Sequence, residues 1–466
     1  MDKFGVGRPE MDKLIAAALS RGGDYADLYF EHTSYGELML RDSQVSSGGF
    51  HIDYGVGIRT LKGEKTGYAY SENTQMPDMM AAAKAASLIA SSQEGQGLDF
   101  HSFCCSKKND FYPIEESWSR HSCGEFKGFL ENLEKAVRAK DERVVKVVAK
   151  LSWSESDVMM YNSFGELAAD TRPMCSVGLN VIFQKGDMIE QKSASRSFRK
   201  GSFMLTGELI ETLASEAVKG IDARFEAQRP KGGKMKVVMG AGASGILLHE
   251  AMGHAFEADF NRKGQSVFEG RMGQKICSDG INIVDDATLE YGRGSLNYDD
   301  EGVSGQKTYM VRDGVLESYL HDRISAAWYG VTPTGNGRRE DFRCNPIPRM
   351  TSTYMESGDA EPEGIIASVK KGIYVDEFSN GQVKIGEGDF TFYVKSGFLI
   401  ENGRLTMPVK DINIIGNGPK ALSDILAVGN DGIVDNGTWT CGKEQSVPVT
   451  CGIPTVLVKS LVVGGE

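Results

Sequence analysis

The segment "SYGEL", Ser34 to Leu38, returns later in the chain as "SFGEL", Ser163 to Leu167. A second echo follows each copy, because "GVGIRTLKGEKTGYAYS" at 55–71 and "SVGLNVIFQKGDMIEQKSAS" at 176–195 both read as hairpins, the first around Gly63. Similar segments in the same order indicate a repeated structural unit. We therefore predict that the first half of the chain is a tandem duplication.

Helical patterns flank each copy of this unit. Apolar residues recur at helical spacing from Met11 to Leu19, and Pro77 marks the start of a second helix at 76–92. Corresponding helices are expected at 125–140 and 207–225. The order helix, strands, helix thus occurs twice, which predicts mixed sheets covered by helices on one face.

The second half of the chain has a different character. Residues 226–236, "EAQRPKGGKMK", read as a linker, and beyond them hairpin-like runs turn at Asp313-Gly314 and Asn402-Gly403. We predict an α+β protein of two domains. Residues 1–228 form an N-terminal α+β domain with the duplication, and residues 229–466 form a mostly β domain with one prominent helix near residue 250.

Composition and charge exclude several classes of protein. The 466 residues are too many for one ordinary core. A net charge of −12 argues against direct binding of nucleic acid, and no apolar run is long enough to span a membrane. The first residues lack the apolar core of a signal peptide, so we expect a cytoplasmic protein. The eight cysteines include no C-x-x-C pair and are expected to be free thiols, mostly buried.

The segment "LLHEAMGHAFEADF", Leu247 to Phe260, contains a candidate metal motif. The familiar zinc-peptidase pattern H-E-x-x-H places two histidines on one helix face, whereas His249 and His254 are five residues apart. On a regular helix their rings would diverge by roughly 140°. A π-bulge makes residues i and i+5 neighbours, and Gly253 tolerates such a distortion. We therefore predict a helix that is irregular at or near Gly253, by a π-bulge, a kink or an early end.

A hydrolytic zinc site uses three protein ligands and keeps one position open, so a third ligand is needed. Spacing alone does not choose among Glu257, His321, Cys441 and Cys451. The flanking residues favour Cys441, which precedes Gly442 and Lys443 in a turn-like context where the lysine is expected to favour the thiolate. Cys451 instead precedes a β-like apolar run.

The acidic cluster "YDDEG", at 298–302, allows two interpretations. Asp299 and Asp300 could hold a peptide amino terminus or a second cation, or the cluster could be a solvated turn. Whether Asp299, Asp300 or Glu257 contributes to the site is left open.

Five segments together resemble the TldD/PmbA family, and in particular its TldD-type zinc metallopeptidases, which are also labelled modulators of DNA gyrase. The segments are "HEAMGHAFEADFNRKGQS" (249–266), "NYDDEG" (297–302), "NPIPRMTSTYME" (345–356), "GNGPKALSDILAVGND" (416–431) and "CGKEQSVPV" (441–449). The resemblance covers nearly all of 230–460 and is looser in the first half. "CGKEQS" lacks a residue that the family pattern has before the glutamine, which affects the expected shape of that loop.

The resemblance implies a zinc peptidase acting on unfolded or extended peptides. It implies that His249, His254 and Cys441 hold Zn²⁺ and that Glu250 is the general base. It also implies a homodimer, or a heterodimer with a PmbA-type chain. Two other functions remain as alternatives: a non-catalytic metal-binding scaffold or partner subunit, and a ligand-binding module whose histidines are core residues.

Overall fold

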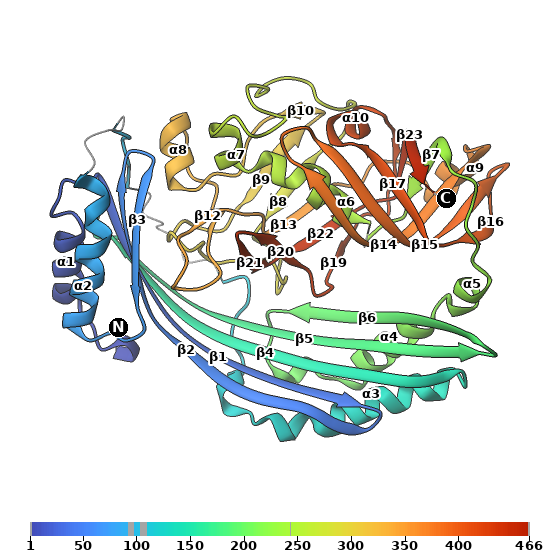
Figure 1. Cartoon of the computed structure of the whole chain (residues 1–466), viewed down its shortest axis with the longest axis horizontal. Coiled ribbons are helices and arrows are strands. Elements are labelled where there is room, and N and C mark those ends of the chain that lie inside the picture. Colours follow the sequence, from blue (N-terminus) through green and yellow to red (C-terminus); the bar gives the residue numbers. More distant parts are fainter. Residues whose placement is uncertain (1, 92–96, 103–109, 243, 465–466) are drawn as a thin grey trace.

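The first half of the chain forms one long antiparallel sheet (Figure 1). The computed structural model describes residues 2–91, 97–102, 110–242 and 244–464. The strands are β1 (Tyr25–Arg41), β2 (Gln44–Lys62), β3 (Lys65–Ser71), β4 (Val144–Asn162), β5 (Leu167–Lys185) and β6 (Met188–Phe198). Their order in the sheet, β3-β2-β1-β4-β5-β6, is symmetric about the β1–β4 pair. Each half of the sheet is therefore one copy of the predicted unit.

The hairpin turns lie at equivalent places in the two copies of the unit, but the "SYGEL" and "SFGEL" segments do not. Gly63 between β2 and β3 and Gly186 between β5 and β6 both adopt the left-handed conformation, with φ of 54° and 60°. The "SYGEL" segment at 34–38 lies inside β1, whereas "SFGEL" at 163–167 covers the turn from β4 to β5. That short echo is a coincidence of composition, and the order of elements carries the duplication.

The mixed sheets that we predicted for this half are wrong in one respect. All the strand pairs of this sheet are antiparallel. Short turns join β1 to β2, β2 to β3, β4 to β5 and β5 to β6, and a parallel pair would need a long crossover instead. The two copies then meet edge to edge through β1 and β4, so they share a single sheet.

The helices cover one face of this sheet, as predicted. They are α1 (Arg8–Ala18), α2 (Met76–Ser87), α3 (Lys127–Lys140), α4 (Gly207–Val218) and α5 (Ile221–Glu226). Along β1, Leu28 and Phe30 pack with α1 and α2, while Leu38 and Leu40 pack with α3 and α4. Alternate residues of a strand share a face, so both helix pairs lie on the same side. The expected helix at 207–225 is divided at Gly220, whose φ is 75°.

The second half contains two larger sheets and two small ones. The seven-stranded sheet comprises β14 (Lys371–Lys384), β7 (Gly233–Met239), β23 (Val456–Gly464), β17 (Ile412–Asn417), β15 (Asp389–Glu401) and β16 (Arg404–Val409), with β18 (Ile425–Val428) paired to β23. The six-stranded sheet comprises β10 (Val315–Leu316), β9 (Lys307–Arg312), β8 (Ile283–Asp286), β13 (Ser352–Met355), β22 (Thr450–Ile453) and β19 (Ile433–Asp435). The two-stranded sheets are β11 (Gly337–Arg338) with β12 (Ile347–Pro348), and β20 (Thr440–Lys443) with β21 (Gln445–Pro448).

Helices in this half are short. They are α6 (Gly245–Leu248), α7 (Ala258–Arg262), α8 (Arg323–Tyr329), α9 (Pro362–Ala367) and α10 (Gly418–Ser423). Further 3-10 turns are Asp2–Phe4, Leu88–Ser91, Trp118–Arg120, Cys123–Phe126, Ser202–Met204 and His254–Phe256. The α+β class with a β-rich second half is thus confirmed, and so are the hairpin turns at Asp313-Gly314 and Asn402-Gly403, where every φ is positive. The domain boundary at 228/229 stays a prediction.

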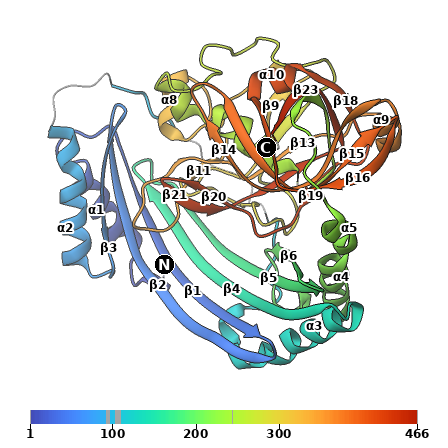
Figure 2. The same cartoon turned by 45° about the vertical axis from the view of Figure 1, so that its right-hand side comes forward.

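The second half lies over the concave face of the long sheet, opposite its helices (Figures 1 and 2). Tyr29, Val158 and Met160 of the sheet pack there against Tyr298 and Phe342. No helix in the described part of the chain has the length and apolarity needed to cross a membrane. The six described cysteines are free and four of them are buried, while Cys104 and Cys105 lie outside the described residues.

Candidate metal centre

The helix that carries the histidines is distorted where the sequence predicts it. After α6 the chain makes a π-helical turn, His249–Gly253, and then the 3-10 turn that starts at His254. The backbone N–H of His254 donates to the carbonyl oxygen of His249, an i→i+5 hydrogen bond. The two imidazole rings consequently lie on one side of the helix, with centroids 5.2 Å apart. The predicted irregularity is confirmed.

Gly253 allows this helix to sit deep in the core between the two large sheets. A Cβ atom at Gly253 would lie 2.2 Å from the Sδ atom of Met350, so a side chain does not fit without movement. Leu247, Leu248 and Met252 contribute to the core that residues of both sheets share. Packing on both sides therefore fixes the position of the distorted turn.

Cys441 joins the two histidines from a distant part of the chain. In the described residues, His249, His254 and Cys441 are all buried, and one ligand atom of each lies within 4.8 Å of the others. The Sγ atom of Cys441 lies 3.4 Å from Nε2 of His254. Two imidazoles and a thiol at this spacing form a group that can hold a metal ion.

The chemistry of these donors also fits a metal. Neither ring nitrogen of His249 has a hydrogen-bond partner among the described residues, although the side chain is buried. A buried polar atom without a partner is costly, and a bound cation would satisfy it. Burial by itself raises the pKa of the Cys441 thiol, but the imidazoles of His249 and His254 outweigh this effect and lower it to about 4. The thiolate is the form that binds metals.

A chain of polar contacts supports His254 from behind. Its Nδ1 atom lies 2.8 Å from Oε2 of Glu257, and that oxygen lies 3.0 Å from Nζ of Lys443. The same Nζ donates to Oδ1 of Asp259 at 2.7 Å. Burial raises the pKa of Glu257, but Lys443 and His254 lower it to about 2, so this group is a carboxylate. Glu257 thus contacts the far nitrogen of a histidine and is not a member of the group itself.

Lys443 has a different place from the one that the sequence suggested. We expected it to favour the thiolate of Cys441, but it pairs with Glu257 and Asp259. The thiolate is favoured by the two imidazoles instead. Because Lys443 follows Cys441 by two residues on β20, both side chains point to the buried side of the strand.

Arg349 holds the backbone of the β20–β21 hairpin, and sequence reasoning did not single it out. Its Nη2 donates to the carbonyl oxygen of Cys441 at 2.6 Å, and its Nη1 donates to that of Gln445 at 2.8 Å. The only signal in the sequence was its place within "NPIPRMTSTYME". The guanidinium thereby fixes the strand from which the Cys441 thiol projects.

Glu250 is the partly open member of the site. Its side chain is 26% exposed, and its Oε2 lies 4.0 Å from Nε2 of His254. The same side chain of His254 is only 6% exposed. Glu250 therefore places a partly exposed carboxylate beside the buried group.

Two other candidate ligands lie outside the group. His321 is buried, and burial lowers the pKa of its imidazole to about 4; its ring contacts those of Tyr319 and Tyr329. Cys451 is buried in β22, where burial and the charges of Asp435 and Glu250 raise the pKa of its thiol well above the ordinary value.

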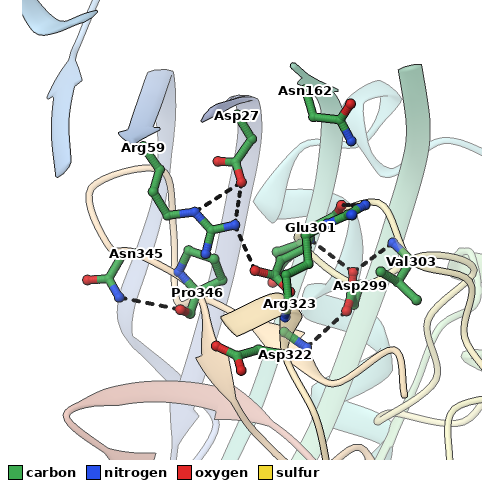
Figure 3. A network of polar contacts seen from close by, with 12 residues as sticks. Asp27, Arg59, Asn162, Asp299, Glu301, Val303, Asp322, Arg323, Asn345 and Pro346 are labelled. Atoms are coloured by element: carbon green, nitrogen blue, oxygen red, sulfur yellow. Dashed lines mark hydrogen bonds and ion pairs between the residues drawn. The ribbon is translucent and has the colours of Figure 1, made fainter. Parts of the chain in front are cut away.

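The acidic cluster at 298–302 joins the two halves of the molecule, and the solvated turn that we considered is wrong (Figure 3). Arg59 of β2 pairs with Asp27 of β1 and, at 2.7 Å, with Glu301. Asp299 accepts hydrogen bonds from the backbone N–H groups of Glu301 and Val303, each 2.9 Å long. Burial and the neighbouring Glu301 raise the pKa of Asp299.

Asp300, the other acidic residue left open above, is used in the same way. Its Oδ1 lies 2.6 Å from Nη1 of Arg172, which belongs to β5. Asp299 and Asp300 thus form part of the contact between the halves and do not join the group of His249, His254 and Cys441.

Comparison with known proteins places this architecture in a family. Three family models match: "PmbA/TldA metallopeptidase domain 1" at 26–90, its "central domain" at 113–224, and its "C-terminal domain" at 232–465. The "Metalloprotease TldD homolog" of Haemophilus influenzae is 39% identical over 459 residues, which cover 96% of this chain and 94% of that protein. The "Zinc metalloprotease TldD homolog" of Saccharolobus solfataricus is 26% identical and covers 98% of this chain and 100% of that protein.

Solved structures show the same fold. The TldE structure from Thermococcus kodakarensis has a TM-score of 0.76 at 21% identity and covers 98% of this chain and 100% of that one. A Thermotoga maritima structure described as a candidate modulator of a DNA gyrase has a TM-score of 0.79 at 22% identity and covers 98% of this chain and 99% of that one.

The curated relatives are named metalloproteases, and they match this chain over nearly its whole length. This protein is therefore a metallopeptidase. It belongs to the PmbA/TldA (TldD/PmbA) metallopeptidase family, as the sequence resemblance predicted.

Proposed function

We propose that this protein is a zinc-dependent peptidase that hydrolyses unfolded or extended peptides, with His249, His254 and Cys441 as the metal ligands. The observation that carries this proposal is the convergence of three donors, buried together, beside the partly exposed carboxylate of Glu250. Two nitrogen donors and one thiolate suit Zn²⁺ and leave a fourth position open. The name of the Saccharolobus relative supports the choice of zinc.

The chain's own residues would divide the chemistry as follows. Bound zinc would supply a Lewis acid that lowers the pKa of a water molecule and polarises the scissile carbonyl. Glu250 takes a proton from the attacking water through a carboxylate oxygen and delivers it to the nitrogen of the leaving amine. Glu257 and Lys443 hold the ring of His254 in the orientation that presents its Nε2. The negative charge of Cys441 weakens the Lewis acid, so a modest turnover rate is expected.

The burial of the site supports extended peptides as substrates. As whole residues, His249, His254 and Cys441 are 1%, 5% and 2% exposed. A peptide bond within a folded domain is held in secondary structure and does not reach such a depth. A single extended segment can enter the site and pair its backbone with the edge of a strand. Such pairing depends little on the side chains of the peptide. Broad specificity would follow.

The cellular compartment and the oligomeric state of the enzyme are part of the same proposal. We place it in the cytoplasm, a reducing compartment in which free cysteines such as the six described ones persist. We also expect it to act as a homodimer or as a heterodimer with a PmbA-type chain, which the fold shared with a TldE structure supports. Purification from the native host, followed by light scattering and mass spectrometry of the partners, measures both the mass and the composition of the assembly.

The proposal is tested by replacing Glu250 with glutamine. Glu250→Gln is expected to bind zinc like the wild type and to lose hydrolysis of an unstructured peptide by at least about 100-fold, because the amide does not accept the proton. Zinc content and the initial rate of cleavage are measured on the same samples. The exposed Glu269→Gln serves as the matched control and should keep both properties.

The outcomes separate the candidate functions. A Glu250→Gln protein that cleaves the peptide at the wild-type rate would contradict the assignment of the base. A wild-type protein that holds zinc and cleaves no peptide, alone or with a PmbA-type partner, would instead favour the non-catalytic scaffold.

A further inference from the structure

A cavity lies on the opposite side of the β20–β21 hairpin from Cys441. It has a volume of about 320 Å³ and extends from the concave face of the long sheet, at Tyr29 and Tyr35, to Thr440 and Ser446 of the hairpin. Side chains alternate along a strand, so Thr440 faces the cavity while Cys441 faces the histidines. The hairpin is therefore a shared wall between this cavity and the candidate metal centre.

Three buried arginines on this cavity have no carboxylate partner among their hydrogen bonds and ion pairs in the described residues. Arg199, Arg293 and Arg338 are 4%, 9% and 3% exposed. Arg293 donates to the carbonyl oxygen of Trp439 and to Oγ of Ser197, and Arg338 donates to the carbonyl oxygens of Met350 and Pro448. These oxygens are dipoles without a full charge, so they do not neutralise the guanidinium groups.

Arg199 is the least satisfied of the three. Its Nη1 makes one long hydrogen bond, 3.4 Å, to the carbonyl oxygen of Pro173, and its guanidinium lies over the ring of Tyr112. Its buried Nε atom has no hydrogen-bond partner in the part of the chain that the structure describes. Burial lowers the pKa of Arg199, and it lowers that of Arg293 to about 10. A buried, charged donor without an acceptor indicates that something with the opposite charge completes the site.

The other charged groups on the cavity leave an excess of positive charge. Arg172 is matched by Asp300 and, from behind the cavity wall, by Asp170 at 3.3 Å, while Arg339 also lines the wall. Glu31 is engaged by the Thr33 hydroxyl and the Phe342 N–H, and burial raises its pKa to about 7. Glu340 is exposed and accepts from the backbone N–H of Ser446. In all, five arginines line the cavity against three carboxylates: Arg172, Arg199, Arg293, Arg338 and Arg339 against Glu31, Asp300 and Glu340.

We propose that this cavity binds a carboxylate group of the peptide substrate and so selects acidic peptides or peptide carboxyl ends. The inference rests on the proposed function and adds a substrate class to it. Arginine presents a planar fork of donors that matches a carboxylate, and the exposed residues Thr440 and Ser446 form the rim through which a peptide passes. The cavity is of a size that holds a ligand of a few residues.

The test compares peptides that differ only in charge. An unstructured peptide is prepared with a free or an amidated carboxyl end, and with an internal Glu or Gln. We expect wild-type kcat/KM to fall about tenfold or more, mainly through KM, on amidation if the cavity takes the α-carboxylate, or on Glu-to-Gln exchange if it takes a side chain. Anisotropy measurements of binding to zinc-loaded Glu250→Gln should show the same preference.

Variants of Arg199 test whether the preference for the charged peptide arises in this cavity. Arg199→Met should remove the preference, so that kcat/KM becomes the same for the charged and the neutral peptide, while Arg199→Lys should restore part of the preference. The matched control is Arg196→Met, three residues before Arg199 and within β6, because Arg196 pairs with Glu216 on the helix-covered side of the sheet. This control should keep the full preference.

The possible failures can be told apart. Wild-type protein that cleaves and binds charged and neutral peptides equally would overturn the carboxylate site, even if every arginine variant misfolds. A preference that persists in a folded Arg199→Met protein would overturn it as well. Charge-selective binding without any cleavage would support the cavity assignment and contradict the proposed peptidase function instead.

Discussion

The Nδ1 atom of His254 lies 2.8 Å from the Oε2 atom of Glu257, three residues further along the chain. This contact leaves the opposite nitrogen, Nε2, to face the Cys441 thiol at 3.4 Å. Glu257 is fully buried, and its charge is balanced by Lys443, which lies on the same hairpin as Cys441. One carboxylate therefore connects the histidine helix to the cysteine hairpin.

Replacing Glu257 with glutamine should weaken zinc binding about 10- to 100-fold, because the amide orients His254 less firmly and leaves Lys443 without one partner. The affinity is measured by competition with a chromogenic chelator. Asp259→Asn is the control, since Asp259 contacts Lys443 at 2.7 Å but makes no contact with the ring of His254. Equal zinc affinity in Glu257→Gln and the wild type would contradict this positioning function.

Cys441→Ser should sharply reduce zinc content and abolish hydrolysis, because an alcohol is a far poorer ligand than a thiolate. Cys451→Ser should retain zinc and lose only some stability, since Cys451 is buried in β22 outside the donor group. Zinc per chain is measured for both variants after dialysis against a mild chelator. A Cys441→Ser protein that holds zinc as firmly as the wild type would eliminate this ligand.

Gly253→Ala should destabilise the protein by about 1–3 kcal/mol, because the added methyl group meets the Met350 sulfur in a filled core. Met350→Ala removes that obstacle while leaving a cavity of its own. The two substitutions together should therefore cost less than the sum of their separate effects. Urea unfolding of the four proteins in the cycle measures this coupling, and strict additivity would show that the contact does not limit residue 253.

His321 should make the protein less stable in mild acid. Its folded-state pKa is about 4, below the value of about 6.5 for an exposed histidine, because burial opposes its charge. Above pH 6.5 the imidazole is neutral in both the folded and the unfolded state, so its titration does not change the free energy of unfolding. As the pH falls from 6.5 to 4, only the unfolded chain takes up the proton, and stability falls by up to about 1.4 kcal/mol per pH unit.

His321→Phe should remove this part of the pH dependence, since phenylalanine keeps an aromatic ring beside Tyr319 and Tyr329 without a titrating group. Free energies of unfolding are compared between pH 7 and pH 4.5 in metal-free protein. A Gln variant at the exposed His101 should keep the wild-type slope. Identical slopes in His321→Phe and the wild type would show that the imidazole does not stay neutral in the folded state.

The sequence by itself determined the features that depend on neighbours along the chain. The hairpin turns at Gly63, Asp313-Gly314 and Asn402-Gly403 were predictable, because a left-handed backbone favours glycine and asparagine. The distorted helix was also predictable, because two histidines five residues apart share a side only where the helix is irregular, and the structure has a π-helical turn there. The quoted motifs also sufficed to indicate the family.

The tertiary structure alone decided which distant groups meet. Short turns specify hairpins but not how two hairpin units join, so the single antiparallel sheet followed only from the pairing of β1 with β4. The choice among Glu257, His321, Cys441 and Cys451 was open for a similar reason, because Cys441 is separated from His254 by 187 residues.

The arginine cavity had no signal in the sequence at all. Its walls come from the long sheet and from the β20–β21 hairpin. In the sequence, Arg199, Arg293 and Arg338 do not belong to any motif that would single them out. Their lack of carboxylate partners became visible only when the two halves of the chain were packed together. Local backbone preferences act over a few residues, whereas burial and charge balance depend on every segment that closes around a group.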